Sequence, residues 1–170
     1  MKRLVQKLAL NIVHLEDDSQ DRKFFASLAK THLAPRLTKF FRQRFQTTCH
    51  PTLVQYSTVD EFVRGLLQTG KRKSFPSVVG RECGLFVLDF YVPDTKGSSP
   101  QGIDQIDVHD DTRQDSRFLD WLKFVFPAIP VLFLTSGEPE VVPAGQWEYM
   151  PKDALNNREA FATTMGQHAE

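Results

Sequence analysis

Polar side chains suited to phosphoryl or metal chemistry follow four separate apolar stretches of this 170-residue sequence. They are Glu16, Asp17 and Asp18 after the first stretch, Asp89 after the second, Thr135 and Ser136 after the third, and Lys152 close to the fourth. Carboxylates can bind a hard cation or attack phosphorus, hydroxyls can hydrogen-bond phosphoryl oxygens, and a lysine supplies a mobile positive charge. One acid after a strand is commonly only the cap of the next helix. Four such endings in one chain predict a site.

The apolar stretches have the length and composition of buried parallel strands. The strands are expected at residues 10–15, 52–57, 84–89, 130–135 and 147–150. Helices are expected at 59–67, around 118–126 and at 154–167, and also after an N-cap at Ser19, in a stretch that continues or restarts after Pro35. Alternating strands and helices predict a parallel sheet covered on both faces. In such sheets a site forms outside the carboxyl ends of the strands, where the polar endings lie.

Composition narrows the class of protein. The formal net charge is zero, so no general attraction to nucleic acid or to an anionic membrane is expected. No apolar run approaches the ~20 residues that span a bilayer, and the basic N-terminus lacks the cleavage site of a signal peptide. Cys49 and Cys83 lie far apart without ligand spacing and are expected as reduced thiols. These observations predict a cytoplasmic protein with a single domain over residues 1–170.

Four sequence pieces, in order along the chain, carry a resemblance to a known family. They are HLEDDSQDR, FVLDFYVPDTKG, PVLFLTSG and EYMPKDA. The second is the most specific, because Asp89 is followed by a proline four residues on and a glycine eight residues on. The chain resembles the response-regulator receiver domains of two-component (phosphorelay) signal transduction, which have a flavodoxin-like fold. The resemblance implies an α/β fold with a doubly wound five-stranded parallel sheet of order 2-1-3-4-5.

The resemblance also implies roles for the polar endings. Asp89 would accept a phosphoryl group from a sensor histidine kinase or a phosphotransfer protein. Mg²⁺ would be bound directly by Asp17 and through water by Glu16, with Asp89 and the backbone carbonyl of Tyr91 completing a short ligand set that suits a cation retaining several waters. Asp18 is expected to be a neighbour of this set and not a ligand.

Residues near the last two strands are implied as the switch. Lys152 would contact the phosphoryl oxygens, Thr135 would hydrogen-bond the phosphoryl group, and Tyr149 would turn inward as Thr135 moves. These changes would form a two-state element that a local charge change biases. The positions that match modulators of hydrolysis in the family are Tyr91, Ser136 and Gly137.

The chain departs from the family pattern in three places. Extra residues between the acid pair and Asp89 predict a lengthened first helix or an additional one. Residues 98–117 belong to a stretch rich in Gly, Ser, Pro and Asp and are expected as an inserted loop after the third strand. Residues 137–146 contain Pro139 and Pro143 and are too few for a full fourth helix. The output or dimerisation surface between helices 4 and 5 is therefore expected to be abbreviated.

Two functions remain open on the sequence. The favoured one is a phosphoacceptor switch that catalyses its own phosphorylation and dephosphorylation and signals through partner proteins, not an enzyme acting on other substrates. The alternative is a receiver-like interaction module that works without phosphorylation. An aspartate-nucleophile phosphatase is disfavoured, because such enzymes need a second acid two residues after the nucleophile and Tyr91 stands there.

Two aromatic features are predicted to serve the core and not a ligand. His14 lies within the first expected strand, where a core or edge histidine is far commoner than a metal ligand. Phe40, Phe41 and Phe45 recur at helical spacing and are expected as a buried stripe. Neither feature enters the predicted site.

Overall fold

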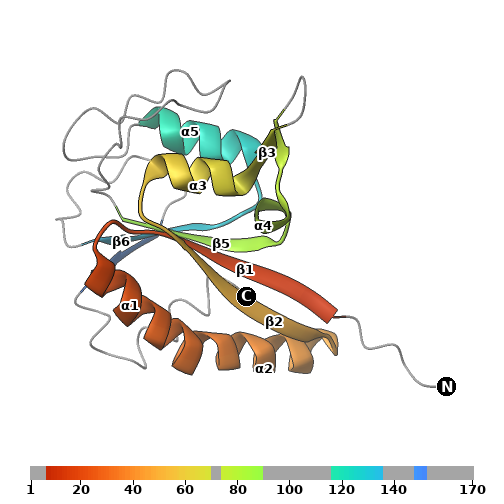
Figure 1. Ribbon diagram of the computed structural model, residues 1–170. Helices are drawn as coiled ribbons and strands as arrows, with labels where there is room; N and C mark the ends of the chain where they lie inside the picture. The colour runs from red at the N-terminus through yellow and green to blue at the C-terminus, as the bar shows by residue number, and fades with distance from the viewer. Residues whose placement is uncertain (1–6, 70–73, 90–115, 136–147, 153–170) are drawn as a thin grey trace.

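Five parallel strands form the central sheet of the computed structural model, which describes residues 7–69, 74–89, 116–135 and 148–152 (Figure 1). They are β1 (Lys7–Leu15), β2 (Thr48–Tyr56), β5 (Cys83–Leu88), β6 (Val131–Thr135) and β7 (Glu148–Pro151). Their order across the sheet is β2-β1-β5-β6-β7, and every neighbouring pair is parallel. Numbered among themselves along the chain, these strands have the predicted order 2-1-3-4-5.

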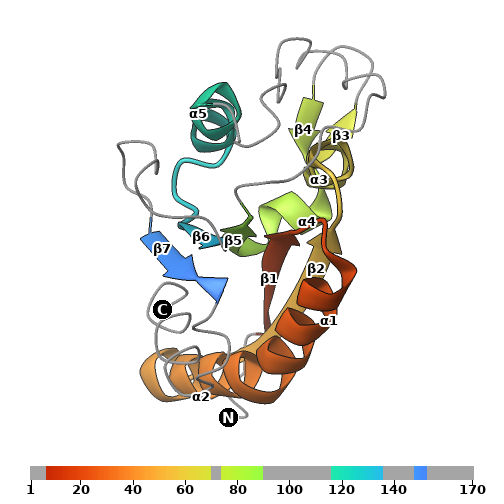
Figure 2. The ribbon, with the colours of Figure 1, turned by 90° about the vertical axis from the view of Figure 1, so that its left-hand side faces the viewer.

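Helices cover both faces of this sheet, as Figures 1 and 2 show. On one face lie α1 (Ser19–Leu28), a π-helical turn (Ala29–Leu33) and α2 (Ala34–Phe45), and on the other lie α3 (Val59–Leu66), α4 (Val78–Arg81) and α5 (Ser116–Val125). Neighbouring strand residues therefore enter different cores. Ile12 packs in the core that contains Phe25, while Val13 packs in the core that contains Phe62 and Phe118. The doubly wound arrangement is as predicted.

The first helical region is extended, as the sequence predicts. α1, the π-helical turn and α2 follow one another without a break from Ser19 to Phe45. Pro35 stands in the first turn of α2 and has no N–H to continue the ladder of the preceding helix. The π turn, in which the Ala34 N–H donates to the carbonyl of Ala29, lies directly before this missing donor. The extra residues before Asp89 thus lengthen the first helix.

The cap of α1 lies one residue earlier than expected. Asp18, and not Ser19, is the N-cap, because its Oδ1 accepts hydrogen bonds from the N–H groups of Gln20 at 2.6 Å and Asp21 at 3.0 Å. These two N–H groups, that of Asp21 first, lower the pKa of Asp18. A carboxylate is also favoured over a hydroxyl by the positive end of the helix dipole.

The segment before β5, expected as a polar loop, contains two short strands and a short helix. β3 (Leu67–Thr69) pairs antiparallel with β4 (Ser74–Pro76), and α4 follows with Ser77 as its N-cap. Strands of three residues are too short to show an alternating pattern in the sequence. The long strands also start earlier than expected, since β1 and β2 pair from Lys7 and Thr48 onward, beyond the apolar core.

The predicted buried stripe on α2 is wrong. Phe40 and Phe41 are half-buried and Phe45 is 55% exposed, whereas Leu37 is the buried residue of that helix. The three rings contact one another, with centroids 5.5 to 5.9 Å apart. Because the helix extends with β2 past the end of the central core, its last turns have less apolar surface to pack against.

Cys49 and Cys83 are both buried and form no disulfide, as predicted. Within the described residues no helix is both long and apolar enough to cross a bilayer. Three predictions fall wholly or mostly outside the described residues: the inserted loop at 98–117, the short stretch at 137–146 and the closing helix at 154–167. The loop prediction extends two residues too far, since α5 begins at Ser116.

Candidate functional site

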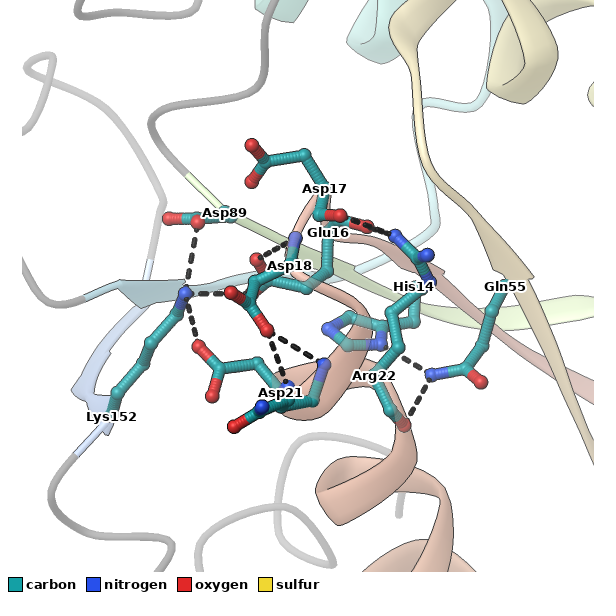
Figure 3. Close-up of polar contacts among 10 residues, drawn as sticks. His14, Glu16, Asp17, Asp18, Asp21, Arg22, Gln55, Asp89 and Lys152 are labelled. Carbon is teal, nitrogen blue, oxygen red and sulfur yellow. Dashed lines mark hydrogen bonds and ion pairs between the residues drawn. The ribbon is translucent and has the colours of Figure 1, made fainter.

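Three of the four predicted polar strand endings converge at the carboxyl edge of the sheet (Figure 3). Glu16 follows β1 directly, and its N–H donates to the carbonyl of Tyr56 on β2 at 3.1 Å. Asp89 follows β5, and its N–H donates to the carbonyl of Leu15 on β1 at 2.9 Å. Lys152 follows β7, across β6 from β5. Parallel pairing thus gathers residues that lie far apart along the chain.

Three carboxylates form an acidic cluster at this edge. Glu16, Asp17 and Asp89 each offer one oxygen, and these oxygens lie within 4.8 Å of one another. Glu16 and Asp89 are buried, whereas Asp17 is exposed, so the cluster is open to solvent on one side. Oxygen donors at this spacing fit a hard divalent cation such as Mg²⁺. Carboxylates this close also repel one another, and a bound cation would relieve that repulsion.

The Lys152 ammonium is a shared counter-ion of this pocket. Its Nζ lies 2.8 Å from Glu16 Oε2, 2.8 Å from Asp21 Oδ2 and 3.0 Å from Asp89 Oδ2. The contact with Asp89 is a hydrogen bond, whereas Glu16 Oε2 has no hydrogen-bond partner within the described residues and meets the ammonium as an ion pair only. Sequence reasoning does not identify Asp21, because it follows no strand. The signal for it is its place in the first turn of a helix that starts at the carboxyl edge.

Burial and neighbouring charges shift the pKa values of the pocket residues. Burial, and then the charge of Asp89, raise the pKa of Glu16 to about 7, although Lys152 opposes both effects. Burial lowers the pKa of Lys152, but its contacts with Asp21, Glu16 and Asp89 outweigh burial and leave that pKa raised. Near neutral pH Glu16 is therefore partly protonated, while Lys152 remains charged.

Arg22 holds the backbone of the acid pair. Its Nη1 donates to the carbonyl oxygens of Glu16 at 2.5 Å and of Asp17 at 2.7 Å. Gln55 on β2 in turn donates to the carbonyl oxygen of Arg22 at 3.0 Å. The N–H of Asp18 donates to Glu16 Oε1 at 3.1 Å. The two acids are thus fixed by contacts from both the first helix and the edge strand.

His14 lies beside the acidic residues, next to Arg22 and Gln55 in Figure 3, and is fully buried. Its ring packs against Phe25, with centroids 4.2 Å apart, and its Nδ1 lies 2.9 Å from Gln55 Nε2. Because an amide nitrogen only donates, Nδ1 is the acceptor and Nε2 carries the proton. Within the described residues Nε2 has no hydrogen-bond partner. Burial first, and then the charges of Lys152 and Arg22, lower the pKa of His14 to about 3. His14 is thus a core residue, as predicted, although only one of its nitrogens is satisfied.

The remaining predicted site residues are placed only in part. Thr135 ends β6 opposite Pro151, and Tyr149 pairs with Phe133 from β7, so the backbones of both lie beside the pocket strands. Tyr91, Ser136 and Gly137 lie outside the described residues. The roles assigned to these five residues remain predictions.

Comparison with known proteins identifies the fold. No protein-family model matches the chain, and no curated protein matches it either. A response regulator receiver protein from Pseudoalteromonas atlantica superposes with a TM-score of 0.51 and 9% sequence identity, over 94% of this chain and 99% of that chain.

Weaker likenesses include proteins of more than one kind. The N-terminal domain of a response regulator/sensory box/GGDEF protein from Carboxydothermus hydrogenoformans gives a TM-score of 0.45, with 17% identity over 92% of this chain and 96% of that chain. A 3-dehydroquinate dehydratase-like protein from Bifidobacterium longum gives 0.44, with 12% identity over 97% and 96%. These two carry no conclusion. The strand order, the helices on both faces and the Pseudoalteromonas likeness show that the chain has the flavodoxin-like fold of response-regulator receiver proteins.

Proposed function

We propose that this chain is a phosphoacceptor receiver domain in which Asp89 takes a phosphoryl group from a phosphohistidine. The observation that carries the proposal is the meeting of Asp89 with Glu16, Asp17 and Lys152 at one edge of the sheet. A carboxylate nucleophile, further ligands for a cation and an ammonium are the groups that phosphoryl transfer to an aspartate requires. The shared receiver fold is consistent with this chemistry.

In the proposed reaction a carboxylate oxygen of Asp89 attacks the phosphorus of the phosphohistidine. The new oxygen–phosphorus bond forms as the phosphorus–nitrogen bond breaks, and the imidazole leaves with the electron pair and takes up a proton. Water later attacks the phosphorus, and the Asp89 carboxylate leaves. An acyl phosphate is labile enough for this return step, so the modification can act as a switch.

A divalent cation is part of the proposal because the pocket is already acidic. Mg²⁺ held by Glu16, Asp17 and Asp89 would neutralise charge that the phosphoryl group brings in. The spacing of the three oxygens supports this ligand set. The backbone carbonyl of Tyr91 is proposed as a further ligand on the resemblance alone.

Lys152 is suited to contact Asp89 before the transfer and the phosphoryl group after it. Its contact with Asp89 Oδ2 at 3.0 Å places a positive charge on the acceptor itself. After transfer the same ammonium can bind phosphoryl oxygens as a mobile point charge. Thr135 and Tyr149 are proposed to respond to that charge as the switch, with Tyr91, Ser136 and Gly137 modulating hydrolysis.

The proposal includes the partners and setting of a two-component system. A sensor histidine kinase or phosphotransfer protein would supply the phosphoryl group, a downstream protein would receive the signal, and the chain would work in the cytoplasm. Catalysis on other substrates is not proposed, because Tyr91 stands where an aspartate phosphatase needs its second acid.

The test is phosphorylation by acetyl phosphate with Mg²⁺, followed by intact-mass measurement. Wild type is expected to gain one phosphoryl group, and Asp89→Asn is expected to gain none. Asp120→Asn, which removes an exposed acid of α5, is the matched control and should behave as wild type. Adding a chelator should abolish the gain.

Two outcomes would count against the proposal. A folded wild type that gains no phosphoryl group from acetyl phosphate or a phosphohistidine donor would favour the phosphorylation-independent interaction module. A gain that persists in Asp89→Asn would place the modification elsewhere.

A further inference from the structure

Asp21 binds Lys152 but stands apart from the acidic cluster. Lys152 Nζ lies 2.8 Å from Asp21 Oδ2, the same distance as from Glu16 Oε2. Among the described carboxylates that contact Lys152, Glu16 and Asp89 belong to the group that fits a divalent cation, and Asp21 does not. Asp21 therefore has a partner in the pocket without being one of the cluster's ligands (Figure 3).

Lys152 and a divalent cation compete for the same two carboxylates. The ammonium contacts Glu16 and Asp89, which a cation in the cluster would also bind. Two positive charges on the same two carboxylate groups repel each other strongly in a partly dry pocket. When a cation enters, this repulsion is expected to move the ammonium off at least one of these two carboxylates.

The position of Asp21 suits it to retain the ammonium. Its N–H donates to Asp18 Oδ1 at 3.0 Å in the first turn of α1, so the helix cap fixes its backbone. Its side chain is 39% exposed, against 1% for Glu16 and 5% for Asp89. An ammonium that keeps only its contact with Asp21 would therefore move outward, away from the cation.

We propose that Asp21 is a positioning residue that holds the Lys152 ammonium at the mouth of the pocket when a cation occupies Glu16 and Asp89. The role rests on the proposed function and adds a residue that none of the sequence motifs assigns. Without Asp21 the ammonium loses its most exposed partner and keeps only Glu16 and Asp89. It then stays on these two carboxylates and weakens binding of the cation.

A double-mutant cycle tests this role through Mg²⁺ affinity, measured by calorimetry on the full chain. The four proteins are wild type, Asp21→Asn, Lys152→Met and the double variant. Asp21→Asn is expected to weaken Mg²⁺ binding about five-fold when Lys152 is present, and much less when Lys152 is replaced. Asp21→Glu, which restores the carboxylate, should recover most of the affinity. Thermal unfolding of each variant checks that it is folded.

The matched control is Asp60→Asn. Asp60 also stands in the first turn of a helix and pairs with a basic side chain, Arg64, at 2.6 Å, but it does not touch Lys152. It therefore reports how much of any effect comes from removing one negative charge near the strand ends.

The outcomes separate this role from the proposed function. An equal loss of affinity for Asp21→Asn in both backgrounds would show that Asp21 acts as a general charge or a ligand, and would overturn the role. Unchanged affinity in Asp21→Asn would overturn it as well. Either result can occur in a protein that binds Mg²⁺ and accepts phosphoryl on Asp89. If wild type neither binds Mg²⁺ nor gains a phosphoryl group, both proposals fail together.

Discussion

Lys152 Nζ lies 3.0 Å from Asp89 Oδ2, although 63 positions separate the two residues along the chain. The exposed fractions of their side chains are 15% and 5%, so water screens this pair only weakly. The same ammonium also contacts Glu16 and Asp21. In the cation-free protein Lys152 is therefore the counter-charge that allows the acids to lie together.

Replacing Lys152 by Met is expected to lower the free energy of unfolding of the cation-free protein by about 2 kcal/mol. The loss is smaller than for a fully buried ion pair, because Lys152 and Asp21 are partly exposed. Mg²⁺ should restore much of the stability, since a cation supplies the missing charge. Urea unfolding with chelator and with Mg²⁺ measures both values, and Lys39→Met, on the exposed side of α2, is the control. Equal losses in the two buffers would contradict the counter-charge role.

Mg²⁺ affinity is expected to fall as the pH drops below neutral. The pKa of Glu16 is raised to about 7, so below that pH a proton occupies a carboxylate that the cation needs. Where Glu16 is protonated, the affinity should fall by up to about ten-fold per pH unit. Calorimetry at pH 7 in two buffers of different ionisation enthalpy should show proton release on binding. The same dissociation constant at pH 6 and pH 8 would argue against this assignment.

Much of the fold could be predicted because its strands are buried on both faces. The run ending at Leu88 is apolar throughout, and the run ending at Leu15 is apolar except for Asn11 and His14. Successive residues of these strands face the two cores alternately. Such runs in alternation with helices indicate a parallel sheet covered on both faces, and the resemblance to receiver domains implies its strand order. The parts that could not be predicted are short or lie beyond the core. The β3–β4 hairpin is one example, and the exposed ring of Phe45 on α2 is another.

The pocket residues that follow strands could be predicted from the sequence, whereas the one that the first helix contributes could not. Glu16, Asp17, Asp89 and Lys152 meet because parallel strands share one carboxyl edge. Asp21 reaches the same pocket from the first turn of α1, where an acid is expected for the helix dipole alone. Sequence spacing does not separate these two uses of an acid, because the orientation of the turn depends on tertiary packing.

His14 is expected to make the protein less stable in acid. Its pKa is lowered from 6.5 to about 3. Between these two pH values the His14 ring is therefore protonated in the unfolded chain and neutral in the folded protein. This difference lowers the free energy of unfolding by about 1.4 kcal/mol for each unit that the pH falls between 6.5 and 3. Glu16 acts in the opposite sense between pH 7 and 4.5, because its pKa is raised and its protonation favours the folded state. The two contributions partly cancel in wild type.

A comparison of wild type with His14→Leu isolates the histidine. In cation-free buffer the variant should gain stability over wild type by about 1.4 kcal/mol for each unit that the pH falls between 6 and 4. His50→Leu, which removes an exposed histidine of β2, is the control for replacing an imidazole by leucine. Parallel curves for wild type and His14→Leu would mean that His14 is not held neutral.

Arg22→Lys is expected to weaken Mg²⁺ binding through the backbone of the acid pair. One guanidinium nitrogen of Arg22 donates to the carbonyls of both Glu16 and Asp17, and a lysine ammonium, which rotates freely, lacks the planar group that fixes the directions of these two N–H donors. The charge is unchanged, so a lower affinity must come from looser placement of the two carboxylates. We expect about 1 kcal/mol of lost stability and a several-fold higher Mg²⁺ dissociation constant, measured by urea unfolding and calorimetry. Arg42→Lys, on the exposed surface of α2, should change neither. If Arg22→Lys lowers stability but leaves Mg²⁺ affinity intact, Arg22 serves the fold and not the site.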